Sequence, residues 1–174
     1  MAVSQRMHDK INEQIQKEFF SEYFYISMEA YFASISLDGF ANFFHVQAQE
    51  ERDHAMKFFG YVIQTSGKVK LMHLDAPRSE FISPSEVFNL TLEHERFITK
   101  SIHSLVEAAL EEKDYTTNSF LQWFINEQIE EERTMHGILD KMKLAGNEAG
   151  GLFHIDKELS ALATAKIVAP LVLE

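Results

Sequence analysis

The strongest constraint on the fold is the helical spacing of apolar residues, every three or four positions, through four long stretches of the chain. The alternation expected of β-strands is missing from all of them. The pattern predicts four long helices and a short fifth helix near the end, with approximate bounds 5–36, 40–66, 84–112, 115–145 and 156–166. Each long stretch also carries a glutamate near its middle, on the apolar side. The chain therefore has to join four amphipathic helices around a core that contains acids.

Breaks between these stretches carry residues that usually start and stop helices. The sequence SPSE at 83–86 reads as a capping box with proline at the first helical position. Asp114 and Asp156 are placed to cap later helix starts, and Gly146 is placed to end the fourth helix.

The connections between helices differ in length, and this predicts the topology. The first and third are short, so each joins an antiparallel pair. The middle connection covers about residues 67–83. A helix of ~27 residues is roughly 40 Å long, and about 17 extended residues reach roughly 56–61 Å. The middle connection can therefore run the length of the bundle. We expect a single all-α domain over 1–174, a four-helix bundle with one long crossover connection and a short fifth C-terminal helix.

Composition excludes several classes of protein. The chain has no cysteine, which excludes disulfides, thiolate zinc sites, iron–sulfur clusters and redox thiols. Its formal net charge of -11 at pH 7 should repel nucleic acid and attract cations. No apolar stretch approaches the roughly 18 residues of a membrane span, and the N-terminal residues lack the apolar region of a signal peptide. We therefore expect a cytoplasmic protein with no nucleic-acid or membrane partner.

The four apolar stripes share one property, because polar residues interrupt each of them near mid-helix. The stripes run through Ile11, Ile15, Phe19 and Ile26; Phe40, Phe44, Ala48, Ala55, Phe58 and Val62; Phe88, Leu92, Ile98, Ile102, Leu105 and Ala109; and Phe120, Phe124, Ile138 and Met142. The interrupting residues are Glu18; Glu51 and His54; Glu95; and Gln128 and Glu131, with Glu127 and Glu130 on the flanks of the last stripe. Glu51 and His54 lie three residues apart, so one helical turn brings both to the same face.

Acids in a protein core are costly unless something neutralises them. Moving one isolated carboxylate into the interior costs several kcal/mol even after relaxation, and four close together also repel one another. No lysine or arginine lies on the stripes, so protonation or bound cations remain as the ways to neutralise the acids. Oxygen ligands with one imidazole and no sulfur suit iron or manganese, and four carboxylates require at least two such ions. A single helical glutamate usually faces solvent, so the hypothesis rests on the coincidence of four.

At these positions the chain resembles bacterial non-haem ferritins. The likeness covers residues from about 8 to 165 and lies in NEQIQKEF around Glu18, AQEERDHAMKF around Glu51, HERFITKSI around Glu95, SFLQWFINEQIEEE around Glu131, and GLFHIDKELS near the end. The resemblance implies a ferritin-like fold and a hollow homo-oligomeric shell of twenty-four subunits. It also implies iron storage and detoxification: Fe(II) is oxidised by O2 or H2O2 at a diiron ferroxidase centre and stored as ferric oxyhydroxide.

The resemblance assigns a role to each interrupting residue. It implies a first iron on Glu18, Glu51 and His54, with Glu51 bridging; a second on Glu95 and Glu131, with Gln128 close by; and a third, weaker site on Glu50, Glu127 and Glu130, with Glu131 shared. Tyr25 matches a tyrosine that can supply an electron, and its alternative is a core tyrosine with a satisfied hydroxyl. Glu22, one turn after Glu18, either adds a carboxylate on the side where iron enters or is solvated.

Two positions separate the chain from haem-binding relatives. Arg52 stands where bacterioferritins have a haem-binding methionine, and Thr134 where they have the histidine of a second ExxH motif, so the resemblance implies no haem. A second site without histidine should bind iron more weakly, which suits iron that moves on to storage. The alternative function is a catalytic diiron or dimanganese oxidase with a retained cofactor, and a third is an inactive structural shell subunit.

Other residues carry weaker signals. The remaining histidines are expected mostly at the surface and receive no metal: His8, His45, His73, His94, His103, His136 and His154. Trp123 is expected to make packing contacts. The apolar tail KIVAPLVLE at 166–174 either packs at an axis of the shell or is disordered.

Overall fold

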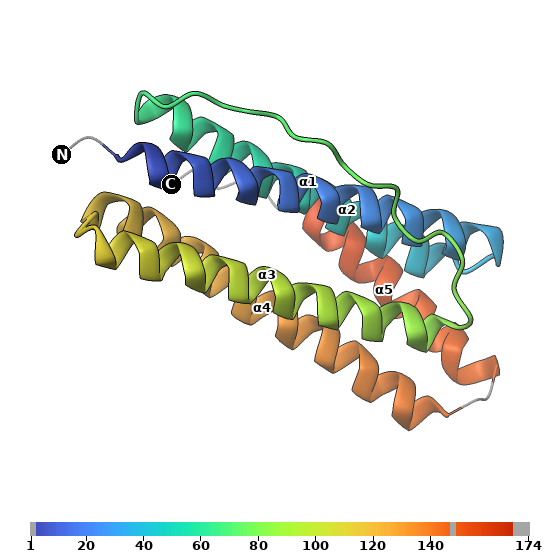
Figure 1. Ribbon diagram of the computed structural model, residues 1–174. Coiled ribbons are helices and arrows are strands. Elements are labelled where there is room, and N and C mark those ends of the chain that lie inside the picture. Colours follow the sequence, from blue (N-terminus) through green and yellow to red (C-terminus); the bar gives the residue numbers. More distant parts are fainter. Residues whose placement is uncertain (1–2, 147–148, 169–174) are drawn as a thin grey trace.

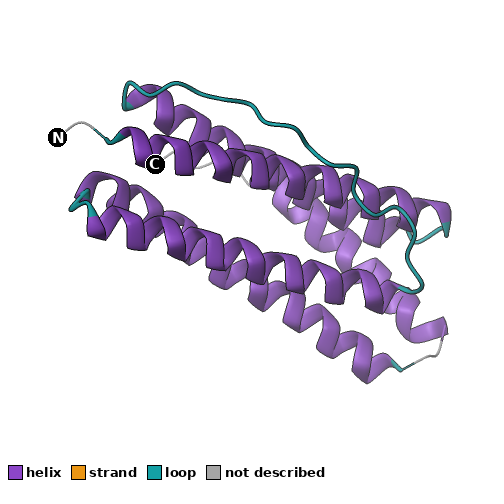
Figure 2. Ribbon diagram, in the orientation of Figure 1, coloured by secondary structure: helices purple, strands orange, loops and turns teal. Residues whose placement is uncertain are grey.

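The computed structural model describes residues 3–146 and 149–168, and this part of the chain forms five helices and no strand (Figure 1; Figure 2). Their bounds are α1 Gln5–Ser34, α2 Asp38–Gln64, α3 Pro84–Glu111, α4 Tyr115–Ala145 and α5 Ala149–Val168. The predicted all-α bundle is confirmed, and α5 packs against α2 and α4. None of the described helices has an apolar run long enough to cross a membrane. Residues 169–174 of the apolar tail lie outside the described part.

Three helices begin at a residue whose side chain caps them, and the sequence predicts two of these caps, Ser83 and Asp114. Ser4, Ser83 and Asp114 each accept a hydrogen bond from the backbone N–H three residues later. At the start of α3, Glu86 Oε2 also accepts from the Ile82 N–H. These bonds satisfy N–H groups that lack a partner inside the helix.

The fifth helix differs from the prediction, because it begins at Ala149 rather than near residue 156. Asp156 does not cap that helix. Its Oδ1 instead accepts a hydrogen bond from the Phe40 N–H at 3.1 Å, in the first turn of α2. α2 lacks a side-chain cap of its own, because Leu37 precedes it. Gly39 permits the close approach, since a Cβ there would lie 1.8 Å from the Asp156 carbonyl oxygen.

The long connection between α2 and α3 runs along the bundle, as predicted, and leaves those two helices parallel (Figure 1). Side chains of α1 fix its course. Asn12 donates to the Lys68 carbonyl at 3.0 Å and accepts from the Lys70 N–H at 2.7 Å. Farther along α1, Ser27 donates to the Arg78 carbonyl at 2.5 Å. These bonds give backbone partners to a segment that forms neither helix nor sheet.

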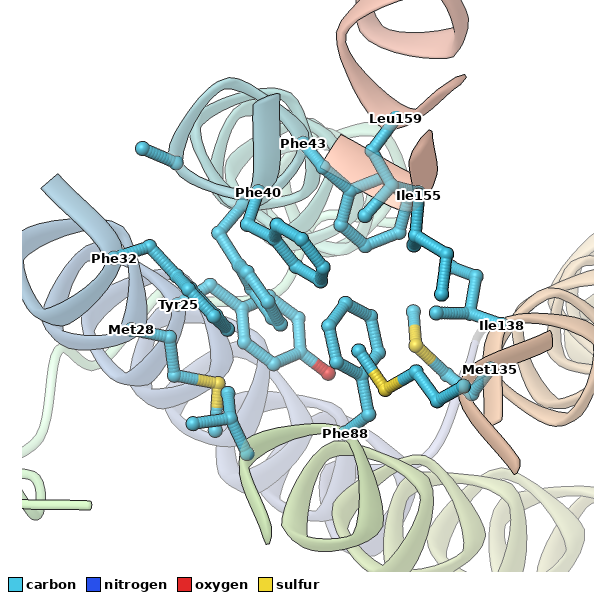
Figure 3. Close-up of a cluster of buried hydrophobic side chains, with 14 of the residues drawn as sticks. Tyr25, Met28, Phe32, Phe40, Phe43, Phe88, Met135, Ile138, Ile155 and Leu159 are labelled. Atoms are coloured by element: carbon cyan, nitrogen blue, oxygen red, sulfur yellow. The ribbon is translucent and has the colours of Figure 1, made fainter. Parts of the chain in front are cut away.

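Two apolar clusters fill the bundle, one toward each end. In the cluster next to α5, Phe32 stacks on Phe40 and Phe44, with ring centroids 4.9 and 5.5 Å apart. Side chains from all five helices meet there (Figure 3). In the other cluster, Phe58 stacks on Phe124 with centroids 4.0 Å apart. On each of the first four helices, the interrupting acid lies between the residues of one cluster and those of the other.

The stripe on α1 differs from the prediction at one position. Ile26 is 43% exposed, whereas Tyr25, Met28 and Phe32 are fully buried. Phe19, seven residues before Ile26, is itself only partly buried. Seven residues make slightly less than two turns of a helix with 3.6 residues per turn, so a stripe extended by sevens moves away from the core.

Candidate metal centre

A belt of buried polar side chains lies between the two apolar clusters, and it contains the interrupting residues predicted from the sequence. None of these is more than 4% exposed: Glu18, Glu51, His54, Glu95, Gln128 and Glu131. They come from α1, α2, α3 and α4, so the bundle places four carboxylates in one buried region. No lysine or arginine is among the buried residues of the described chain.

The side of the belt contributed by α1 and α2 has the geometry of a metal site. One turn of α2 separates Glu51 from His54, and His54 Nδ1 lies 3.6 Å from Glu51 Oε2. Glu18 joins them from α1, and one ligand atom from each residue lies within 4.8 Å of the other two. Within the described residues, this is the only group of three acidic or histidine side chains with ligand atoms so close together. We name Glu18, Glu51 and His54 the first half of the centre.

Glu18 has one oxygen that no hydrogen bond satisfies. Its Oε1 accepts from Gln14 Nε2 at 2.7 Å, whereas Oε2 is buried without a hydrogen-bond partner, alone among the side-chain atoms of the described residues. A buried acceptor in this state costs about 1–3 kcal/mol, and more if it is charged. Burial raises the pKa of Glu18 well above its ordinary value, and the Glu51 carboxylate raises it further. A bound cation, or a proton shared with the Glu51 carboxylate, would relieve both penalties.

On the side contributed by α3 and α4, hydrogen bonds satisfy the carboxylates. Tyr25 Oη donates to Glu95 Oε1, and Gln128 Nε2 donates to Glu95 Oε2 at 3.0 Å. Glu131 Oε2 accepts from Gln47 Nε2 at 2.9 Å. We name Glu95, Gln128 and Glu131 the second half of the centre. These donors fix the orientation of the carboxylates in the second half.

The crowding of acids also shifts protonation across the belt. Burial raises the pKa of Glu51 well above its ordinary value, and the carboxylates of Glu95 and Glu131 add to the rise. Burial raises the pKa of Glu95 as well, but hydrogen bonds from Tyr25 and Gln128 oppose that rise. Burial, and then the Glu95 carboxylate, raise the pKa of Tyr25 well above its ordinary value. The tyrosine therefore stays a neutral O–H donor.

Two amides that the sequence did not single out touch these carboxylates. Gln14 on α1 and Gln47 on α2 are fully buried, and each donates to an acid of the belt. A signal was present, because Gln14 lies one turn before Glu18 and Gln47 lies one turn before Glu51. A polar side chain one turn from a candidate ligand, inside an apolar stripe, is well placed to orient a ligand.

The glutamates expected to form a third site lie at the edge of the belt. Glu50 and Glu127 are partly buried, and Glu130 is exposed. They do not form a group of close ligand atoms comparable to the first half. Glu127 Oε1 lies 4.0 Å from His54 Nε2. Glu130 lines a cavity of about 510 Å³ between α2, α4 and α5, and Gln47 lines the same cavity. The cavity thus adjoins the second half of the centre through the Gln47–Glu131 hydrogen bond.

Two further residues named in the sequence lie beside the belt. Glu22 pairs with Arg52 at 3.4 Å, with Arg52 largely exposed, so its carboxylate has a partner outside the buried group. Trp123 is 39% exposed, and its ring lies in a T-shaped contact with His54, with centroids 5.4 Å apart. Lys57 Nζ lies 3.4 Å from the centroid of the Trp123 ring. The predicted packing contacts of Trp123 therefore include one with the ring of His54.

Five of the seven histidines expected mostly at the surface are exposed, and two are not. His8 is buried, and its Nε2 lies 2.9 Å from Thr65 Oγ1. His94 lies against the rings of α1, and its Nε2 lies 2.8 Å from Ser21 Oγ. Burial lowers the pKa of His94 to about 4. Both have a hydroxyl partner, and neither belongs to a group of close metal-ligand atoms in the described residues.

Comparison with known sequences identifies relatives of the whole bundle. The family model of the ferritin-like domain matches residues 8–145. The bacterial non-heme ferritin of Campylobacter jejuni is 44% identical over 156 residues, which cover 90% of this chain and 93% of that protein. The bacterial non-heme ferritin of Bacteroides fragilis is 41% identical over 157 residues, which cover 90% of this chain and 98% of that protein.

Solved structures extend the likeness to three dimensions. The open pore ferritin of the hyperthermophilic archaeon Archaeoglobus fulgidus superposes with a TM-score of 0.90 at 46% identity, over 91% of this chain and 97% of that chain. An engineered closed form of that ferritin gives a TM-score of 0.89 at 47% identity, over 91% and 96% of the two chains. With sequence and fold in agreement across the helices that carry the belt, the chain belongs to the ferritin-like domain family and is a relative of the bacterial non-haem ferritins.

Proposed function

We propose that the protein stores and detoxifies iron. In this proposal Fe(II) is oxidised by O2 or H2O2 at a diiron ferroxidase centre inside the bundle, and the product is kept as a ferric oxyhydroxide mineral in a hollow shell of twenty-four subunits. The observation that carries the proposal is the unpaired, buried Glu18 Oε2 beside Glu51 and His54, in a relative of bacterial ferritins. Iron is the substrate and the cargo.

The donor set supports iron as the ion. It combines carboxylate oxygens with one imidazole and contains no sulfur, a combination that suits iron or manganese. In the proposal the ligands are Glu18, Glu51 and His54 for the first iron, with Glu51 bridging; Glu95, Glu131 and Gln128 for the second; and Glu50, Glu127 and Glu130 for a third, weaker site. The missing histidine at Thr134 leaves the second iron with oxygen ligands and an amide.

The protein side chains act mainly through charge and protons. Protons and ferrous ions compete for Glu18, Glu51 and Glu95, because burial raises the pKa of all three. Tyr25 keeps its proton and donates to Glu95, and in the proposal it supplies an electron to the iron that Glu95 would hold. The negative charge of the chain favours the approach of cations.

A pair of irons matches the electron count of the oxidants. Two ferrous ions supply two electrons, which with two protons convert one O2 to H2O2, or one H2O2 to two waters. The second half has no histidine among its ligands, so we expect its iron to be held more weakly and released more readily toward storage. An oxidase with a fixed metal pair would need the opposite, two tightly held ions.

Iron loading tests the proposal. Ferrous salt is added anaerobically at many equivalents per chain, oxygen is admitted, and ferric absorbance is followed; native mass spectrometry and the iron content of the soluble fraction are then measured. We expect rapid oxidation and iron retained in a large soluble particle. Glu51→Ala should lose rapid oxidation, whereas Glu22→Gln, an acid on the neighbouring helix outside the buried group, should keep it.

The possible results separate the three functions. Oxidation without iron retention would point instead to a diiron or dimanganese oxidase with a retained cofactor. A shell without catalysed oxidation would indicate a structural subunit. A Glu51→Ala variant that oxidises iron at the wild-type rate would contradict the assignment of the site.

A further inference from the structure

Three hydrogen bonds link a lysine near the surface to the buried carboxylate of Glu18. Lys17 Nζ donates to Ser101 Oγ at 2.7 Å, Ser101 Oγ donates to Gln14 Oε1 at 2.5 Å, and Gln14 Nε2 donates to Glu18 Oε1 at 2.7 Å. Lys17 and Gln14 belong to α1 and Ser101 to α3, so the path leaves α1 and returns to it. We name Lys17, Ser101 and Gln14 the donor chain.

The chemistry of the lysine fixes the direction of the whole donor chain. An ammonium group has three donors and no acceptor, so the Ser101 oxygen must accept from Lys17. The single Ser101 proton is then free to go to Gln14 Oε1. With its oxygen held in this way, the Gln14 amide has to present its NH2 group to Glu18.

The hydrogen bond that Ser101 donates to Gln14 is not the one that a serine usually makes within its own helix. Serine and threonine hydroxyls in helices commonly bond to the carbonyl four residues earlier. Ser21 and Thr91 do so in this protein, to the carbonyls of Lys17 and Val87. The Ser101 hydroxyl instead gives its proton to a buried amide on another helix.

The donor chain begins at a hollow of about 200 Å³ on the surface between α1 and α3. Lys17 lines this hollow together with Lys100 and Ser104. The Lys17 ammonium lies 5.8 Å from the centroid of the Phe97 ring, so a ring and a hydroxyl both contact the lysine end. Lys100 and Ser104 supply matched control positions in the same hollow.

We propose that the donor chain positions Glu18 for the first metal ion. It holds Glu18 Oε1 and leaves Oε2, the oxygen without a partner, for the ion. Its members are positioning residues, because they act through Glu18. The inference rests on the proposed function to the extent that it requires a metal ion at the first half of the centre. Supporting groups of this kind typically set the affinity of a metal ligand that they orient.

Metal titration of the assembled, metal-free protein tests the proposal without iron oxidation. Co(II) is added anaerobically, and the visible absorption bands and heats of binding report the tight and weak steps separately. Ser101→Ala should weaken the tight step roughly 10–100-fold and leave the weak step unchanged, the range found for groups that support a ligand. Lys17→Met, which keeps the aliphatic stem, should weaken the same step to a smaller extent.

Three controls distinguish positioning from general damage. Ser101→Thr keeps the hydroxyl and should bind Co(II) like the wild type. Ser104→Ala and Lys100→Met alter the same hollow and should also leave both steps unchanged. In a Glu18→Gln background, Ser101→Ala should add no further loss, because the donor chain acts only through that carboxylate.

The results separate failure of this inference from failure of the proposed function. A wild-type protein that binds no Co(II) would overturn the metal centre and the donor chain together. If the wild type binds two ions per chain, the inference is overturned in any of three cases: Ser101→Ala titrates like the wild type, it weakens both steps equally, or Ser101→Thr fails to restore the tight step.

Discussion

The two halves of the buried centre differ in how they deal with their charges. The first half brings three ligand atoms within 4.8 Å of one another and leaves Glu18 Oε2 without a hydrogen-bond partner. In the second half, both oxygens of Glu95 accept hydrogen bonds, and Glu131 accepts one from Gln47. The first half therefore keeps a buried oxygen that only a proton or a cation can satisfy, whereas amide and hydroxyl donors already supply the second half.

This difference follows the construction of the bundle. Glu18, Glu51 and His54 lie on the antiparallel pair α1 and α2, and the second half lies on the pair α3 and α4. The pairs also support each other, because Tyr25 of α1 and Gln47 of α2 donate to the carboxylates of the second half. We expect the first half to fill first and the second half to exchange its metal more readily.

The largest expected effect comes from removing a ligand of the first half. His54→Ala should lower the rate of Fe(II) oxidation by more than about 100-fold, beyond what the loss of a supporting group costs. It should also remove the tight step of Co(II) binding, whereas Glu95→Ala should remove only the weak step. Stopped-flow absorbance and anaerobic titration measure the two quantities. If both variants lost the tight and weak steps of Co(II) binding equally, the two halves would not bind metal as separate sites.

The next effect concerns pH and the metal-free protein. A carboxyl with a higher pKa in the folded than in the unfolded state destabilises the fold as pH rises from its ordinary value of 4.5 toward the raised pKa. Glu18→Gln should therefore increase the free energy of unfolding near pH 7 by about 1–4 kcal/mol and change it little near pH 4. Glu95→Gln should give a smaller gain, because hydrogen bonds already oppose the shift of Glu95.

Denaturant unfolding of the metal-free protein at a series of pH values measures this comparison. A gain from Glu18→Gln that is independent of pH would contradict its electrostatic origin. A larger gain from Glu95→Gln would mean that the buried carboxylate of the second half destabilises the fold more than that of the first half.

A smaller effect is expected from removing a hydrogen-bond donor of the second half, which leaves one of its carboxylate oxygens without that donor, as in the first half. Tyr25→Phe removes the hydroxyl that donates to Glu95 Oε1 and leaves that oxygen without this donor. The metal-free protein should lose about 1–3 kcal/mol of unfolding free energy, the usual cost of an unsatisfied buried acceptor. Saturating Co(II) should recover part of the loss. Thermal unfolding with and without Co(II) checks this, and a variant as stable as the wild type would show that the tyrosine bond contributes little.

The smallest effect is expected at Glu22. This carboxylate pairs with the exposed Arg52, and exposed ion pairs contribute about 0–1 kcal/mol. Glu22→Gln should leave the tight step of Co(II) binding and the oxidation rate within experimental error of the wild type. A clear loss of Co(II) affinity would show that Glu22 also belongs to the first half of the centre.

Sequence reasoning succeeded where one helix alone determines the result. The spacing of Glu51 and His54 fixes both on one face of α2, and the interrupted stripes placed Glu18, Glu95 and Glu131 in the core. The long bundle helices were equally readable, because their caps and periods are local. The assignment of these residues to particular irons remains a prediction from resemblance.

Sequence reasoning failed where the partner lies on another helix. Asp156 looked like a local cap, but its partner is the Phe40 N–H, 116 residues away. Gln47 showed no partner in the sequence, since Glu131 reaches it only after α2 and α4 come together. Contacts of this kind depend on the rotation and offset of whole helices, which periodicity alone does not specify.

The cap that Asp156 gives to α2 has a consequence for the order of events during synthesis. The ribosome makes residue 156 long after Phe40 has emerged, so the start of α2 lacks its cap until most of the chain is complete. The first turn of the helix that bears Glu51 and His54 thus gains its side-chain cap only when the last helix arrives. A nascent chain cut short before that point would carry the ligands of α2 on a helix whose first turn lacks this cap.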